Sequence, residues 1–155
     1  DEIDVFHPAL MLAQTGVDVI DPINYARLIA LEPRPGFLPK SILMTEGIAP
    51  DGSGDNFTPP TGTEAQAVAM GLPLMTPAIR PYPQLQLCAG STAIPPEGLS
   101  GNLAGGLASG VLAQWLPAAG SDGHFVVFDV PEARAQVAGF LAALADDPVG
   151  KVPAP

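Results

Sequence analysis

Two glycine-rich loops hold the residues of this chain that are best suited to acid–base chemistry. His124 follows Gly-Ser-Asp-Gly at 120–123, and Asp55 follows Gly-Ser-Gly at 52–54. An imidazole can take a proton from a hydroxyl nucleophile, and a carboxylate that accepts a hydrogen bond from the imidazole fixes its tautomer. Taken alone, each residue also fits a surface-loop histidine or a turn aspartate. The presence of both, on separate loops, favours catalysis.

The acidic loop also has a weaker resemblance to a calcium loop. Asp51, Ser53 and Asp55 alternate as the first ligands of an EF-hand do. That pattern needs an acidic residue at its twelfth position, where this chain has Gly62. No metal site and no cofactor are therefore predicted.

The elements that would position these loops can be read from apolar runs and their boundaries. Residues 40–47 form a short apolar run between Pro39 and Gly47, which is typical of a buried strand in a parallel sheet. A polar loop follows at 49–60. A helix should come next, with Thr63 and Gln66 as a capping box and Gly71 as its stop.

The second loop is flanked in a similar way. Residues 103–116 hold a helix or a strand, and 111–116 would suit a strand at an edge of the sheet. The clearest helix begins at Pro131, with apolar residues at helical spacing after it. No element is predicted in the proline-rich segment 72–100, and the last five residues, 151–155, are expected to fray.

The first 39 residues are predicted to be helical and loop-like, with helices that open at His7-Pro8 and Asp21-Pro22. Taken together, a strand, a loop and a helix occur twice in succession. This order indicates an α/β fold with a mostly parallel sheet and flanking helices. Ligands of such sheets bind at the carboxyl ends of the strands, which is where both loops would lie.

Composition narrows the possible partners. The 155 residues are 47% hydrophobic and carry a net charge of -10, which argues against binding to nucleic acid. The single cysteine, Cys88, excludes a disulfide within the chain. The charge-free run 98–121 contains Asn102, Pro117 and many glycines, so a buried core segment is predicted there and not a membrane span.

Three stretches resemble the α/β-hydrolase superfamily, in particular bacterial esterase-like and lipase-like members. KSILMTEGIAPDGSGDNFTPP at 40–60 is similar to the seventh strand and acid loop of that fold. GSDGHFVVFDVPEARAQVAGFL at 120–141 is similar to its terminal histidine segment. FHPALMLAQTGVDVIDPINYA at 6–26 is similar to the stretch that precedes the seventh strand in some bacterial members.

The resemblance implies that Asp55 is the acid of a catalytic triad and that His124 is its general base. Asp51 and Asp129 are the alternative acids, and Asp129 is also placed to cap the last helix. Asp122 is too close in sequence to His124 to be the expected partner of the ring.

The chain departs from the family at the nucleophile. The family carries its serine in Gly-x-Ser-x-Gly, ahead of the acid in the chain. Ser91, Ser100 and Ser109 lack this motif and come after the acid, and the oxyanion-hole segment is also absent. The resemblance therefore implies that residues 1–155 are the C-terminal half of one α/β-hydrolase domain. Residues 1–39 would be a helical, cap-like segment, and 40–155 would hold the last strands, both loops and the C-terminal helix.

The missing half, with the serine, is expected on a separate N-terminal chain left by proteolytic processing. The function implied is a carboxylic ester hydrolase that works through an acyl-enzyme on an ester or lipid-like small molecule. Two alternatives stay open: a non-catalytic binding or scaffold protein of the same fold, and a relative with an aspartate or cysteine nucleophile.

The sequence also bears on substrate contact and on the cellular location of the protein. Met75 and the proline-rich segment 72–96 are candidates for the lining of a lipid or aryl pocket. The proline-rich loops, the low content of charged residues and the absence of an initiating methionine favour a secreted, periplasmic or cell-envelope bacterial enzyme.

Overall fold

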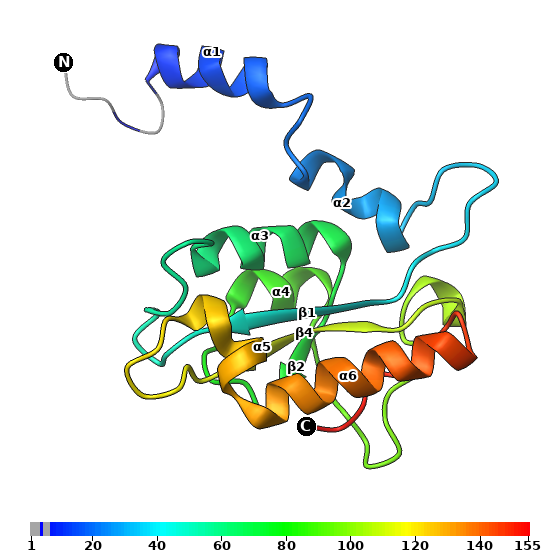
Figure 1. The fold of residues 1–155 in the computed structure, drawn as a ribbon. Helices are drawn as coiled ribbons and strands as arrows, with labels where there is room; N and C mark the ends of the chain where they lie inside the picture. Colours follow the sequence, from blue (N-terminus) through cyan, green and yellow to red (C-terminus); the bar gives the residue numbers. More distant parts are fainter. Residues whose placement is uncertain (1–3, 5–6) are drawn as a thin grey trace.

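A parallel sheet with helices on both faces forms the body of the molecule (Figure 1). The computed structural model describes residues 4 and 7–155. In this part of the chain the sheet has four strands in the order β1-β4-β2-β3, all parallel. They are β1 (Ile42–Gly47), β2 (Leu74–Thr76), β3 (Ser91–Ala93) and β4 (Gly110–Trp115). The α/β class predicted from the sequence is confirmed.

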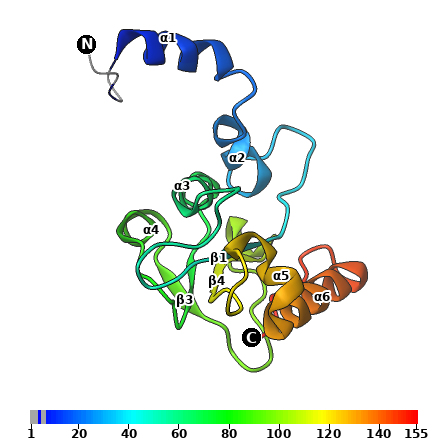
Figure 2. The ribbon, with the colours of Figure 1, turned by 60° about the vertical axis from the view of Figure 1, so that its left-hand side comes forward.

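The helices cover the sheet from two sides. Figure 2 shows α3 and α4 on one side and α5 and α6 on the other. The helices are α1 (Pro8–Val17), α2 (Ile23–Ala30), α3 (Pro60–Met70), α4 (Pro83–Cys88), α5 (Val126–Asp129) and α6 (Pro131–Asp146), with short 3₁₀ turns η1 (Ala104–Gly106) and η2 (Gly123–Phe125).

Strand β4 divides the core into two apolar layers. Because side chains alternate along a strand, Leu112 packs with α2, α3 and α4, whereas Val111 and Ala113 pack with Phe140 of α6. All three strand residues are fully buried. The sequence predicts a strand at the edge of the sheet here. That position is wrong, since β4 lies between β1 and β2 and is covered on both faces.

Helix boundaries follow local signals in most places. Gly71 ends α3 in the left-handed conformation, at φ 71°, as predicted. The predicted start of α3 at Thr63 is wrong, because the helix begins at Pro60, whose fixed φ suits a first turn. Helix α6 begins at Pro131, as expected.

Segment 72–100 is more ordered than its composition indicated. It contains β2, α4 and β3, and the two strands pair with each other over three residues. The C-terminal residues also do not fray, since Val152 is buried and exchanges two 2.8 Å backbone hydrogen bonds with Leu99.

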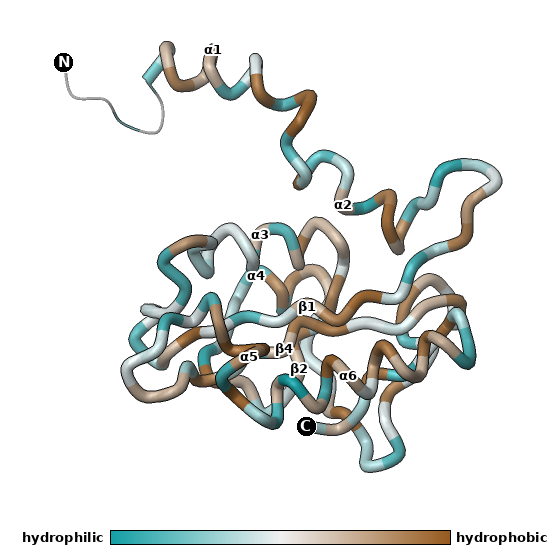
Figure 3. Tube along the Cα trace, in the orientation of Figure 1, coloured by the Kyte–Doolittle hydropathy of each residue, from teal (hydrophilic) through white to brown (hydrophobic). Residues whose placement is uncertain are grey.

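Helices α1 and α2 form the predicted helical segment ahead of β1. Helix α1 has no buried residue, and Figure 3 shows apolar positions along it that the sheet does not cover. Exposed apolar side chains in and after α1 include Leu10, Met11, Leu12, Val17, Val19 and Ile20. Within residues 4 and 7–155, no helix combines the length and apolar composition needed to cross a bilayer.

Candidate active site

Asp55 and His124 meet at the carboxyl edge of the sheet. Asp55 lies in the loop after β1, His124 lies in η2 after β4, and these two strands pair directly in parallel. Nδ1 of His124 lies 3.0 Å from Oδ2 of Asp55. The side chain of Asp55 is 14% exposed and that of His124 is 42% exposed. The structure thus brings together two residues that are 69 positions apart in the chain.

The Asp55 carboxylate is oriented by its own loop. Its Oδ1 accepts backbone N–H bonds from Phe57 and Thr58, each at 2.7 Å. The other oxygen, Oδ2, is then directed at the imidazole. In a neutral imidazole whose Nδ1 donates to Asp55, Nε2 carries no proton, as a general base requires. Nε2 has no hydrogen-bond partner within the described part of the chain.

Asp122 ties the two loops together. Its Oδ1 accepts from the backbone N–H of His124 at 2.9 Å, and its Oδ2 accepts from Nδ2 of Asn56 at 2.6 Å. The hydrogen bond from the His124 backbone, followed by those from Asn56, lowers the pKa of Asp122. Asp122 is therefore a brace between the loops and not the partner of the ring.

Three glycines allow the two loops to touch through their backbones. A Cβ on Gly47 would lie 2.1 Å from the carbonyl oxygen of Gly123, and one on Gly54 would lie 2.1 Å from the carbonyl oxygen of Gly47. The N–H of Gly123 donates to the carbonyl of Gly54 at 3.1 Å. Gly123 thus serves close packing beside His124, since no larger residue fits there.

The other acids considered from the sequence are engaged elsewhere. Asp51 accepts from the backbone and hydroxyl of Ser53, and these bonds lower the pKa of Asp51. Asp129 accepts a hydrogen bond from the Ser121 hydroxyl and makes no side-chain cap on α6, so its predicted capping role is wrong. Among the described residues, no group of three or more His, Cys, Asp or Glu side chains could hold a metal ion.

Among the described residues, no serine hydroxyl is hydrogen-bonded to the His124 ring; those of Ser41, Ser53 and Ser121 donate elsewhere. The hydroxyls of Ser100 and Ser109 donate to the carbonyl of Gly150, and Ser109 is fully buried at the amino end of β4. Ser91 opens β3, at the far edge of the sheet. The other histidine, His7, accepts from the backbone N–H of Ala9 as the N-cap of α1.

A buried polar network that the sequence pattern does not reveal lies beneath the acid loop. Nε2 of Gln114 donates to Oε2 of Glu46 at 2.9 Å across β4 and β1, and Oε1 of Gln114 accepts from the backbone N–H of Arg80 at 3.0 Å. The Arg80 guanidinium lies against the acid loop, where a Cβ on Gly52 would be 2.9 Å from Nη1. Glu64 of α3 is also buried, and neither of its carboxylate oxygens has a hydrogen-bond partner among the described residues.

Burial controls the charge of this network. Removal from water raises the pKa of Glu46 to about 7, with a smaller increase from the nearby Glu64. Burial likewise raises the pKa of Glu64 and, together with the two glutamates, that of Tyr82. Gln114 and Arg80 oppose the shift at Glu46. Glu46 directly precedes Gly47, so its protonation state bears on the strand end that carries the acid loop.

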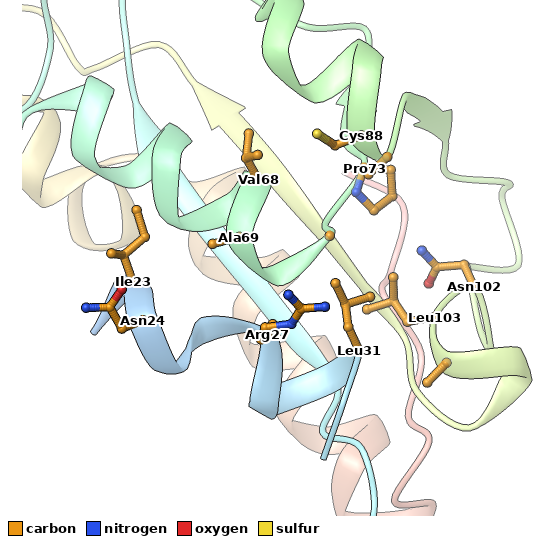
Figure 4. Close-up of a pocket in the computed structure, with 13 residues that line it drawn as sticks. Ile23, Asn24, Arg27, Leu31, Val68, Ala69, Pro73, Cys88, Asn102 and Leu103 are labelled. Carbon is orange, nitrogen blue, oxygen red and sulfur yellow. The ribbon is translucent and has the colours of Figure 1, made fainter. Parts of the chain in front are cut away.

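A large cavity lies away from Asp55 and His124. It measures about 830 Å³ and lies between α2, α3 and the segments that lead into β2 and β4 (Figure 4). Leu31, Val68, Cys88 and Leu103 contribute to its walls. Because the segments before these strands lie at the amino edge of the sheet, this cavity is not part of the candidate site.

The predicted substrate contact of Met75 is wrong. Met75 is 3% exposed and packs in the core with Val111, Phe140 and Val152. Its sulfur accepts from Nε2 of Gln136 at 3.3 Å. The apolar side chains next to His124 are instead Phe57 and Phe125.

Two backbone N–H groups orient the Asp55 carboxylate, and the carboxylate orients the imidazole of His124. Within residues 4 and 7–155, no nucleophile is hydrogen-bonded to Nε2. No protein-family model, no curated protein and no solved structure matches the chain significantly.

Proposed function

We propose that this chain supplies the acid, Asp55, and the general base, His124, of a carboxylic ester hydrolase. The nucleophilic serine would come from an N-terminal chain outside these 155 residues. The observation that carries the proposal is the 3.0 Å contact between Nδ1 of His124 and Oδ2 of Asp55, which leaves Nε2 free. The order of acid before histidine is also that of α/β-hydrolases, in which the serine comes first.

The sheet supports a partner on the β1 side. Within the described residues β1 pairs only with β4, so its outer edge has no strand beside it. An edge of this kind carries free N–H and C=O groups and is a template for a further strand. A strand there would lie next to the strand that leads into the Asp55 loop, which suits a partner that carries the nucleophile.

The proposed reaction assigns each residue one role. The partner's serine oxygen attacks the carbonyl carbon of the ester, and its proton passes to Nε2 of His124 while Asp55 stabilises the imidazolium. The bond to the alcohol oxygen then breaks, and Nε2 returns the proton to that oxygen. Water repeats the sequence on the acyl-enzyme and releases the carboxylic acid, which restores the serine.

Replacement of His124 tests the proposal. The protein that carries this chain, produced whole in its native host, is assayed with a short-chain nitrophenyl ester. His124→Ala should lower kcat by at least about 10³-fold, since the base is lost. His7→Ala is the matched control, because it removes the other histidine, which only caps α1. Full activity of His124→Ala would refute the role of the base.

The alternatives from the sequence give different results in the same assay. A non-catalytic scaffold would show no hydrolysis that depends on His124. An aspartate or cysteine nucleophile would give hydrolysis that depends on His124 but no reaction with a serine-directed probe.

A further inference from the structure

Two phenylalanines form an apolar surface on the imidazole. The Phe57 ring lies 5.0 Å from the His124 ring at an interplanar angle of 47°, and the Phe125 ring lies 5.1 Å from it, edge to face. The two phenylalanine rings are 6.0 Å apart. Phe57 comes from the acid loop and Phe125 directly follows the histidine, so both loops contribute.

Neither ring belongs to the core. Phe57 is 69% exposed and Phe125 is 40% exposed, and neither is part of the two apolar layers around the sheet. Leaving this much aromatic surface in water forgoes the stabilisation that burial would give. A function outside the packing of this chain therefore accounts better for the two rings than a contribution to the core.

The position of the two rings limits which part of a substrate can lie against them. Nδ1 of His124 is taken by Asp55, so the reacting groups must approach Nε2. The leaving oxygen has to come within hydrogen-bond distance of Nε2 to receive its proton. The carbon atoms attached to that oxygen then lie beside the imidazole, against which both phenylalanine rings pack.

We propose that Phe57 and Phe125 bind the alcohol part of the substrate, and that the substrates are esters of bulky apolar alcohols such as aryl-methyl alcohols. This inference rests on the proposed function. The rings would contact the alcohol group and not the acyl group, because His124 protonates the alcohol oxygen whereas the acyl carbon is bonded to the serine. Edge-to-face and offset contacts with an aromatic alcohol match the way the rings already pack on His124.

Acetate esters of different alcohols test the inference. Methyl acetate and benzyl acetate have the same acyl group and alcohols of similar leaving ability, so the ratio of their kcat/KM values reports contacts with the alcohol. We expect the protein that carries this chain, produced whole, to favour benzyl acetate by about tenfold or more, from the apolar area buried. Phe57→Ala should lower this ratio about tenfold.

Phe128→Ala is the matched control, because Phe128 is 70% exposed on α5 and has no ring contact with His124. Its ratio should equal that of the wild type. An unchanged ratio in Phe57→Ala would overturn the inference. If kcat/KM fell equally on both esters, Phe57 would be a positioning residue. Loss of an associated chain from Phe57→Ala in gel filtration would also overturn the inference, since the ring would then be an interface residue. Absence of any His124-dependent hydrolysis would overturn the proposed function itself.

Discussion

Replacing the buried Glu46 by glutamine should change how the stability of the fold depends on pH. Glu46 is 3% exposed, and burial raises the pKa of its carboxyl group from an ordinary 4.5 to about 7. The folded state therefore binds a proton at Glu46 between these pH values that the unfolded state has released. The free energy of unfolding should fall as the pH rises through this window.

The size of the effect follows from the two pKa values. At about 1.4 kcal/mol per pH unit, Glu46 should cost the fold roughly 3 kcal/mol at pH 8 relative to pH 4. Glu46→Gln stays neutral and can still accept the hydrogen bond from Gln114. The variant should match the wild type near pH 4 and exceed its free energy of unfolding by up to about 3 kcal/mol at pH 8.

Urea unfolding at pH 4.5 and pH 8, followed by the fluorescence of the single tryptophan, Trp115, measures this difference. Glu97→Gln is the matched control, because Glu97 is exposed and its replacement should leave the pH dependence unchanged. If Glu46→Gln were as sensitive to pH as the wild type, or less stable at pH 8, Glu46 would be ionised in the fold and the reasoning would be wrong.

Two further pairs of substitutions test the site and the packing around it. Asp55→Asn should lower kcat about 10⁴-fold through loss of the correct His124 tautomer, whereas Asp51→Asn should lower kcat less than about tenfold. Steady-state ester hydrolysis compares the two variants. A larger loss in Asp51→Asn would make Asp51 the acid. Gly47→Ala should disrupt the contact with the His124 loop and lower stability by about 2 kcal/mol or more, because its Cβ would meet backbone at 2.1 Å. Gly62→Ala in α3 meets nothing within 4 Å and should raise stability by roughly 0.5–1 kcal/mol; thermal unfolding that ranked the two alike would contradict the packing argument.

The elements that could be predicted are marked by local features of the sequence at their boundaries. Strand β1 is a short apolar run closed by Pro39 and Gly47, and the end of α3 and the start of α6 are set by Gly71 and Pro131. Strands β2 and β3 could not be predicted, because each has three residues and no periodicity. They exist through pairing with each other and with Leu112 of β4.

The candidate site also has a part that could be predicted from the sequence and a part that could not. The pairing of Asp55 with His124 was predicted by resemblance to a family order of acid and histidine. The buried partnership of Glu46 with Gln114 was not, because sequence does not reveal which polar residue of an apolar strand finds a partner across the sheet. The sequence also does not show why position 123 must be glycine, because the cause is close contact with Gly47 and Gly54, which are far away in the chain.

Labelling with a fluorophosphonate probe tests the central claim most directly. The probe bonds to a serine only when a base activates its hydroxyl. We predict one labelled serine outside these 155 residues, found by denaturing gel and peptide mapping, and loss of the label in His124→Ala. No labelling, label on a serine of this chain, or labelling unchanged in His124→Ala would contradict the claim that Asp55 and His124 activate a serine supplied by a partner.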